Sequence, residues 1–324
     1  MSAKPIWGYD MTTSTSILAA GSDPASILTT VSTGLSNGAL YALLAIALVT
    51  VFRTTGHLNF AQGEFAMLSA LLSFSLIAAG LPIWVAIIAS MVISAVASAA
   101  IQYFIMRPLE KRGHAAALIA VLGLFLFANA FGGVVWGIDN KTPLAPFPDS
   151  VDDRITVLDG TPPFTLSYIT IGIWLTLAAL LVFLWLLLSK TKLGLAYRAV
   201  ISNRSSAALA GIPVAATFAL GWALAAVPGT LAGVMTSQAA SALSFTMMAN
   251  VLIYGFTAAC VGGFDSFGGA VVGGLLVGLV ESVVPSIFPA IGAQSGLALA
   301  LVMLLVVLTV RPQGLFGRKE VARV

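Results

Sequence analysis

Long apolar segments separated by short polar breaks follow one another along most of the chain. Each apolar segment is about 15 to 25 residues long, which is typical of a membrane-spanning helix rather than of the short alternating strands of a membrane barrel. The seventh and eighth segments are short, so either is a candidate half-helix. The pattern predicts an all-α, polytopic membrane protein with about eight or nine transmembrane or half-membrane helices, including discontinuous segments. The expected spans lie near 31–52, 64–80, 82–106, 115–137, 167–189, 214–235, 247–262, 270–284 and 296–310.

The composition agrees with this pattern. Hydrophobic residues make up 59% of the 324 residues and charged residues only 8%, and the mean hydropathy is +1.03. A water-soluble domain of this composition would aggregate, so soluble classes of protein are excluded. The one cysteine, Cys260, rules out an internal disulfide and a paired-cysteine metal site. His57 and His114 stand on different loops without metal-ligand spacing, so we expect neither a metal site nor catalytic residues.

Basic residues are concentrated in three of the polar breaks. Segments 107–114, 190–213 and 311–324 hold eleven of the 15 Lys and Arg residues. By the positive-inside rule these segments face the cytoplasm, whereas 138–166, which carries several aspartates, faces outward. The net charge of +3 therefore follows the topology, and nucleic-acid binding is not expected.

This topology divides the chain into three parts, with the N-terminus outside and the C-terminus in the cytoplasm. Residues 1–30 are expected to be an N-terminal external segment, 31–310 a transmembrane domain and 311–324 a cytoplasmic tail. The start of the chain lacks a basic region leading into a continuous apolar core, so a cleaved signal peptide is not expected. Either Met1 or Met11 could serve as the start residue.

A polar segment, "RTTGHLNFAQGEF" at residues 53–65, separates the first two spans. One explanation is an ordinary cytoplasmic turn whose side chains lie in water. The other is that Asn59, Gln62 and Glu64 lie at membrane depth beside a substrate pathway, where unwound backbone is tolerated next to protein or a water-filled cavity. Aromatic residues interleave with the polar ones, which a turn in water would not require.

A second polar island is the glycine-rich segment "CVGGFDSFGGAVVGGLLVG" at residues 260–278. Glycines flank Asp265 and Ser266, which predicts a tight turn that opens a helix with Ser266 as its N-cap. Two glycine pairs at G-x-x-x-G spacing follow, which is typical of close helix packing in a bilayer. The pairs are Gly269 with Gly273 and Gly274 with Gly278. Direct contact with a ligand is the alternative role for these glycines.

The third island lies inside the basic segment, at residues 194–214. Its first half is amphipathic, and residues 205–209 are expected to form a short helix that Gly211 and Pro213 end. A short helix projecting from a membrane domain suits docking into a groove on a soluble partner. A loop in which Arg198 and Arg204 merely snorkel to the membrane interface is the alternative.

Four stretches together resemble one family of membrane proteins. They are "GLSNGALYALLAIALVTVFRTTGHLNFAQGEF" near the start, "GLAYRAVISNRSSAALAGI" in the middle, "GGFDSFGGAVVGG" later and "RPQGLFG" at the end. The sequence resembles, over about residues 31–318, the permease subunits of ABC importers for branched-chain amino acids and related substrates, including the urea and short-chain amide branch. The first and last motifs in combination are specific to this family.

The resemblance implies a multi-pass subunit of a bacterial-type inner membrane that works by alternating access. Its implied partners are a second related permease, two cytoplasmic ATPases, an external solute-binding protein and the membrane lipids. ATP would be used by the partner subunits and no cofactor by this chain, in which the motif G-x-x-x-x-G-K-[ST] does not occur.

The resemblance also implies roles for individual residues. Matching the polar segment places Asn59, Gln62, Gly63 and Glu64 in the substrate pathway, where amides suit a zwitterionic or neutral polar solute. Matching the middle motif implies an ATPase-coupling set, in which residues 207–209 form a small apolar knob. That set comprises Arg198, Asn203, Arg204, Ala207, Leu209 and Gly211. The family often has an acidic residue where this chain has Ser205, which argues against a charge-based contact there.

Two other functions compete with an importer subunit on sequence grounds. A proton-coupled secondary transporter would need an ionisable relay, for which Glu64, Asp265 and Glu281 are the candidates, all near the expected ends of spans. A passive channel for a small neutral solute is the second rival. The identity of the solute, and whether the two permeases are identical, stay open at this point.

Overall fold

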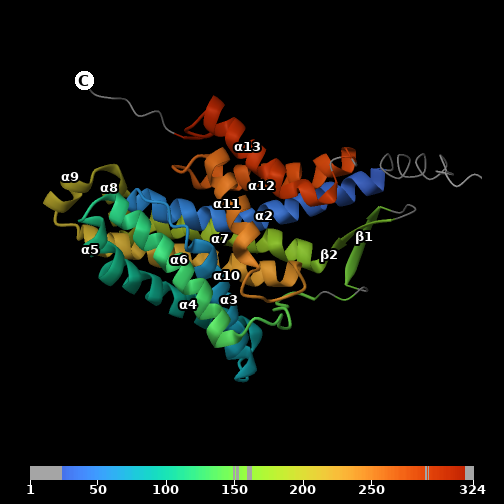
Figure 1. Ribbon diagram of the computed structural model, residues 1–324, viewed down its shortest axis with the longest axis horizontal. Coiled ribbons are helices and arrows are strands. Elements are labelled where there is room, and N and C mark those ends of the chain that lie inside the picture. Colours follow the sequence, from blue (N-terminus) through green and yellow to red (C-terminus); the bar gives the residue numbers. More distant parts are fainter. Residues whose placement is uncertain are drawn as a thin grey trace, which may run out of the picture.

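Helices make up most of the part of the chain that the computed structural model describes, which comprises residues 24–148, 150, 153–158, 163–288, 290 and 292–317 (Figure 1). The expectations for residues 1–23 and 318–324 lie outside the described residues. These include the start residue, most of the N-terminal external segment and half of the C-terminal tail.

Each of the predicted spans is helical in the structure, so the prediction of an all-α membrane protein is confirmed. The first helix begins at Pro24, earlier than expected, because Ser and Thr residues in its first turns weaken the apolar signal without breaking the helix. The helices that match the spans are α2 (Pro24–Thr55), α3 (Gln62–Ala78), α4 (Ile83–Ala100), α6 (His114–Trp136), α7 (Tyr168–Lys190), α10 (Val214–Ala239), α11 (Met248–Gly262), α12 (Phe267–Ile287) and α13 (Gly296–Val310).

Six of the described helical segments are long and apolar enough to cross a membrane. The other three, α3, α11 and α13, have 17, 15 and 15 residues, and at about 1.5 Å per residue they fall short of a hydrocarbon core of about 30 Å. Among the two candidate half-helices, α11 is therefore short as predicted. The prediction for α12 is wrong, because its 21 residues include a Gly-rich first turn and a Pro-containing last turn that dilute its apolar signal.

Several smaller elements escaped the sequence analysis. The α4 helix continues through a π-helical turn, η1 (Ile101–Met106), into α5 (Arg107–Glu110), and a short 3₁₀ turn, η3 (Ala293–Ser295), precedes α13. Two antiparallel strands, β1 (Arg154–Leu158) and β2 (Phe164–Ser167), form a hairpin between α6 and α7, with Arg154 opposite Ser167 and a bulge near Thr156. The aspartates in this segment hide the short alternating pattern of its strands.

The α2 helix is the central helix of the bundle. It packs against α10, α11 and α12, and Figure 1 shows it running along the long axis of the molecule. The residues of its middle section, from Ala39 to Val49, are buried. A helix that is apolar all round is expected to occupy such a central position.

Glycines allow close contact between α2 and α12. A Cβ atom added at Gly278 would collide with the carbonyl oxygen of Gly34, and one added at Gly274 would lie 2.7 Å from the Cβ atom of Ala42. On the α11 side, an added Cβ at Gly273 or Gly269 would collide with backbone atoms of that helix. The four glycines of the two G-x-x-x-G pairs therefore lie where helix backbones touch, which is the geometry expected of helix packing in a bilayer.

The turn that opens α12 has the predicted N-cap. The Ser266 hydroxyl accepts a hydrogen bond from the backbone N–H of Gly269 at 3.0 Å, so this prediction is confirmed. The start of the C-terminal tail packs against the end of α11, just before this turn. There the N–H groups of Leu315 and Phe316 donate to the carbonyls of Val261 and Gly262 at 2.8 and 3.1 Å.

The two ends of the bundle differ in charge. One end, here called the basic end, contains α5, α8 (Lys192–Ser202) and α9 (Arg204–Leu209), and it receives the C-termini of α2 and α11. The opposite end carries the β1–β2 hairpin (Figure 1). The basic sequence segments 107–114 and 190–213 thus meet at one end.

Substitution of Gly278 by Ala should destabilise the fold, because the new methyl group would force α2 and α12 apart. Overpacking of this kind costs about 1–3 kcal/mol. We expect a clear drop in the midpoint of thermal unfolding of the purified protein and a lower yield. Gly123→Ala is the matched control, since no atom lies within 4 Å of a Cβ placed there. Equal stability of the two variants would contradict the packing role.

Candidate functional site

The residues of the polar segment at 53–65 that the sequence singles out are buried. The exposed fractions of the Asn59, Gln62 and Glu64 side chains are 1%, 2% and 3%. The explanation that these side chains lie in water is therefore wrong, because the loop folds back into the bundle. We call Asn59, Gln62, Gly63 and Glu64 the polar corner.

Hydrogen bonds inside the polar corner hold the irregular backbone between α2 and α3. The Asn59 side chain accepts from the N–H of Ala61 and donates to the side-chain oxygen of Gln62, both at 3.1 Å. Gln62 in turn donates from Nε2 to the carbonyl of Ala225 at 3.2 Å. Burying an amide without hydrogen-bond partners costs free energy, and the pairing of these amides avoids that cost.

The contact between Gln62 and α10 depends on a small neighbour. A Cβ atom added at Gly229 would lie 2.9 Å from Nε2 of Gln62. Pro228 lies in the same turn of α10 and has no backbone N–H group, so the carbonyl of Leu224 does not receive its usual helical hydrogen bond. Since Ala225 lies near the middle of α10, the polar corner lies at the depth of the bundle interior and not at its end.

The last two residues of the polar corner contact two further helices. Glu64 accepts a hydrogen bond from Nδ2 of Asn129 in α6 at 3.1 Å. Gly63 faces Leu252 of α11, whose Cβ atom would be 3.1 Å from an added Cβ. The polar corner thus joins α3 to α6, α10 and α11, and it positions the start of α3.

At the basic end, two short helices form the predicted projecting segment. Thr191 caps α8 by accepting from the N–H of Gly194 at 3.1 Å, and Asn203 caps α9 by accepting from the N–H of Ser206 at 2.9 Å. The predicted short helix at 205–209 is confirmed as α9, and the chain leaves it through Gly211, whose φ is +80°. Such a φ favours glycine, which explains the residue at this point.

The side chains of α9 differ in their contacts and exposure. Arg204 donates to the carbonyl of Thr54 at 3.0 Å and its guanidinium lies 4.9 Å from the ring centre of Phe218, so Arg204 does more than snorkel. Ala207 is only 4% exposed, whereas Leu209 is 91% exposed. The expected knob therefore needs a correction: the methyl group of Ala207 faces this chain, and Leu209 projects outward.

Two histidines meet beside α9. The Nδ1 atoms of His57 and His114 are 3.0 Å apart, so a hydrogen bond between them requires one nitrogen without a proton. Burial, together with the charges of His114 and Arg204, lowers the pKa of His57 below its ordinary value. A lowered pKa means that the folded state resists protonation of His57, so the stability that neutral His57 contributes is present at neutral pH and is lost as the pH falls. Among the described residues, no group of three or more His, Cys, Asp or Glu side chains could hold a metal ion.

A polar groove lies between the N-terminal half of α2 and the C-terminal half of α12, at the hairpin end. Its volume is about 440 Å³. We call it the outer groove, and its walls are Thr29, Thr30, Thr33, Asn37, Glu281, Ser282, Pro285 and Ser286. The sequence does not reveal this groove as a unit, because its polar residues come from helices about 240 residues apart.

Hydrogen-bond acceptors lie on both walls of the outer groove. The hydroxyls of Thr29, Thr30 and Thr33 donate back to carbonyls of α2 at 2.8 to 3.0 Å, which leaves their oxygens as acceptors toward the groove. The Tyr41 hydroxyl fixes the Glu281 carboxyl group by donating to Oε2 at 2.5 Å, and the Tyr41 ring stacks on Tyr254 at 4.6 Å between centres. These acceptors, with one carboxyl group among them, suit a ligand that carries N–H donors.

Comparison with known proteins agrees with the resemblance noted in the sequence. The family described as "Branched-chain amino acid transport system / permease component" matches residues 30–309. The high-affinity branched-chain amino acid transport system permease protein BraD of Pseudomonas aeruginosa is 31% identical over 306 residues, covering 90% of this chain and 96% of BraD. The corresponding protein LivH of Escherichia coli K12 is 29% identical over 306 residues, with the same coverage of 90% and 96%.

A solved structure, PsaBC from Streptococcus pneumoniae in complex with Fab, aligns with a TM-score of 0.46 at 13% identity. The alignment covers 92% of this chain and 96% of that chain. A likeness at this level carries no argument about fold or function.

Substitution of Gln62 by Leu should destabilise the protein, because it removes the bond to Ala225 and leaves the Asn59 amide without its partner. An unsatisfied buried polar group costs about 1–3 kcal/mol. We expect a lower midpoint of thermal unfolding in detergent. Gln294→Leu, at an exposed position in η3, is the control and should unfold like the wild type. Wild-type stability of Gln62→Leu would show that the polar corner does not brace the fold.

Proposed function

Because the chain belongs to the family of permease components of branched-chain amino acid transport systems, we propose that it carries branched-chain amino acids or related small polar solutes. The chain is a permease subunit of an ABC importer in the inner membrane. A secondary transporter and a passive channel, the two rivals left open by the sequence, do not fit this family. The match over residues 30–309 is the observation that carries this proposal.

We further propose the partners that such an importer requires. They are a second related permease, two cytoplasmic ATP-binding subunits and an external solute-binding protein. ATP is used by the ATP-binding subunits, and this chain binds no cofactor of its own and no nucleic acid. Residues 31–310 form the permease domain and 311–324 the cytoplasmic tail.

The proposed orientation places the basic end in the cytoplasm and the hairpin end outside. Segments 107–114 and 190–213 carry seven Lys and Arg residues and meet at the basic end, in agreement with the positive-inside rule. With the C-terminus of α2 at the cytoplasmic face, its 32 residues extend about 48 Å along the helix axis, longer than a hydrocarbon core of about 30 Å. The outer groove then lies near the outer mouth of the bundle.

In this orientation the outer groove is the proposed place where the permease first contacts the solute. An α-amino acid carries an ammonium group, which the Glu281 carboxylate and the hydroxyl oxygens of Thr29 and Thr33 would accept. The Asn37 amide, which has both donors and acceptors, would meet the solute carboxylate. The groove opens outward, where a solute-binding protein would release its solute.

The polar corner has a supporting role in the same proposal. Asn59, Gln62, Gly63 and Glu64 lie beside the inner half of the pathway and hold its irregular backbone, since their amides are paired within the chain. The corner links α3 to three other helices, so a shift of α3 during alternating access would be transmitted to them.

The short helix α9 is the proposed contact with an ATPase. Leu209, almost fully exposed at its end, would enter a groove on that partner. The rest of the coupling set positions α9: Asn203 caps it, Arg204 and Ala207 fix it to this chain, Gly211 ends it, and Arg198 lies on α8 before it.

Substitution of Glu281 by Gln should impair uptake, because the amide still accepts from Tyr41 but no longer attracts an ammonium group. We expect leucine uptake by proteoliposomes containing the full transporter, its binding protein and internal ATP to fall roughly tenfold, the scale of one charge-assisted bond. Asp265→Asn, at an exposed position before α12, is the control. Uptake without ATP that an uncoupler abolishes would instead refute the ATP-driven importer.

Substitution of Leu209 by Asp should weaken binding of the ATPase, since a charge would replace the apolar side chain that enters the partner. Loss of a buried Leu contact costs about 2–5 kcal/mol, so co-purification of the ATPase should fail. Ser205→Asp adds the same charge to the same helix and is the control. Normal co-purification of Leu209→Asp with normal solute-stimulated ATP hydrolysis would rule out this contact.

A further inference from the structure

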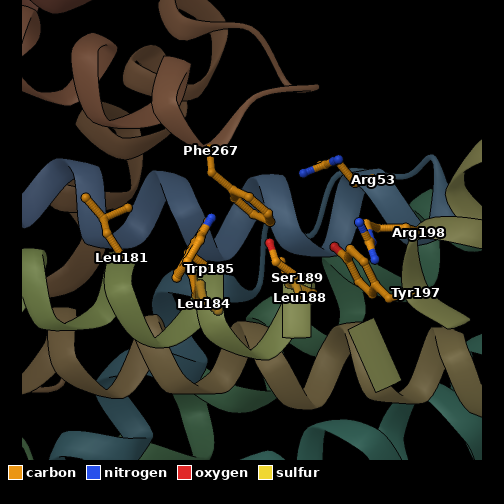
Figure 2. Close-up of a pocket in the computed structure, with 9 residues that line it drawn as sticks. All are labelled: Arg53, Leu181, Leu184, Trp185, Leu188, Ser189, Tyr197, Arg198 and Phe267. Carbon is orange, nitrogen blue, oxygen red and sulfur yellow. The ribbon is translucent and has the colours of Figure 1, made fainter. Parts of the chain in front are cut away.

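A pocket at the basic end has been given no ligand so far, although one of its residues, Arg198, belongs to the proposed coupling set. It lies between α2, α7, α8 and the first residue of α12, and its volume is about 310 Å³ (Figure 2). We call it the two-arginine pocket, and it is lined by Arg53, Leu181, Leu184, Trp185, Leu188, Ser189, Tyr197, Arg198 and Phe267.

Both basic side chains of the pocket have unused charge. The Arg53 guanidinium lies 4.7 Å from the ring centre of Phe267, and Arg198 donates from Nε only to the carbonyl of Gly194 in its own helix, at 3.4 Å. In the part of the chain that the structure describes, no carboxylate forms an ion pair with either residue. Figure 2 shows both guanidinium groups at the end of the pocket next to Tyr197.

The rest of the pocket is apolar, and its rim lies on the exposed side of α7. Leu184 and Leu188 form its buried floor, while Trp185 on its rim is 58% exposed. Exposed apolar residues of α7, including Val182 and Leu186, continue from this rim along the outside of the bundle. The floor extends from Leu181 to Ser189, a distance of about 12 Å along the helix axis.

We propose that the two-arginine pocket binds an anionic phospholipid of the cytoplasmic leaflet. Its phosphate lies between Arg53 and Arg198, and the first part of one acyl chain lies along Leu184 and Leu188. Basic pockets between spanning helices on the cytoplasmic side have the charge and depth that such headgroups require. This inference rests on the proposed orientation of the basic end and not on the identity of the solute.

The geometry favours a lipid over the two other occupants with matching charge. A free phosphate would use the two guanidinium groups but would leave the apolar floor exposed to water, at a cost in free energy. An acidic surface of an ATPase would approach from beyond the end of the bundle, whereas the pocket opens along the side of α7. Only a molecule with an anionic head and an apolar tail fills both parts of the pocket.

The test uses the assembled transporter, purified with its partner subunits and titrated with phosphatidylglycerol or phosphatidylcholine under native mass spectrometry. We expect Arg53→Gln to weaken phosphatidylglycerol binding about fivefold, the effect of one basic residue near an anionic headgroup. Lys192→Gln, which removes a charge from α8 outside the pocket, is the control and should bind like the wild type. Ser189→Trp, at an exposed position on the rim, should block the pocket while keeping both arginines.

Specific outcomes would overturn the proposal. They are equal binding of the two lipids by the wild type, wild-type binding of phosphatidylglycerol by both Arg53→Gln and Ser189→Trp, and binding of inorganic phosphate that is as tight as that of phosphatidylglycerol. Loss of the ATPase from Arg53→Gln with unchanged lipid binding would assign the pocket to the ATPase instead. If Arg53→Gln fails to fold, Ser189→Trp decides: weakened lipid binding supports the proposal and unchanged binding rejects it.

Discussion

Close contact between the backbones of α2 and α12 is the constraint on which the other features depend. In a bilayer the hydrophobic effect does not drive helices together, so association requires close van der Waals packing over a smooth surface. Gly34 and Gly38 on α2 face Gly274 and Gly278 on α12, and larger side chains would collide there. The outer groove lies between the same pair of helices.

Hydrogen bonds of buried polar side chains are the second constraint on helix positions, because an unpaired polar group in a low-dielectric interior costs free energy. Gln62 reaches the carbonyl of Ala225, and the Tyr197 hydroxyl donates to the carbonyl of Thr50 at 3.1 Å. Each bond joins segments more than 140 residues apart. The first bond fixes α3 against α10, and the second fixes α8 against α2.

The two ends of the bundle have different proposed roles, which follow from the charge of each end and from the length of α2. At the basic end, α8 and α9 are anchored through Tyr197 and Arg204 to the last turns of α2. Movement of α9 would therefore act directly on the helix that also forms one wall of the outer groove. This connection gives the proposed ATPase contact and the proposed solute contact a shared rigid element, although they lie at opposite ends of the bundle.

The sequence by itself determined the class of the protein, the positions of its spans, the N-cap at Ser266 and the short helix α9, because these depend on local hydropathy and local turn chemistry. Motif resemblance also identified the family. Only the tertiary structure decided that the polar corner is buried, that Ala207 faces inward while Leu209 projects, and that Glu281 meets Tyr41. These facts depend on which faces of distant helices pack together, and in a chain that is apolar on nearly every face the periodicity of one helix does not reveal its neighbour.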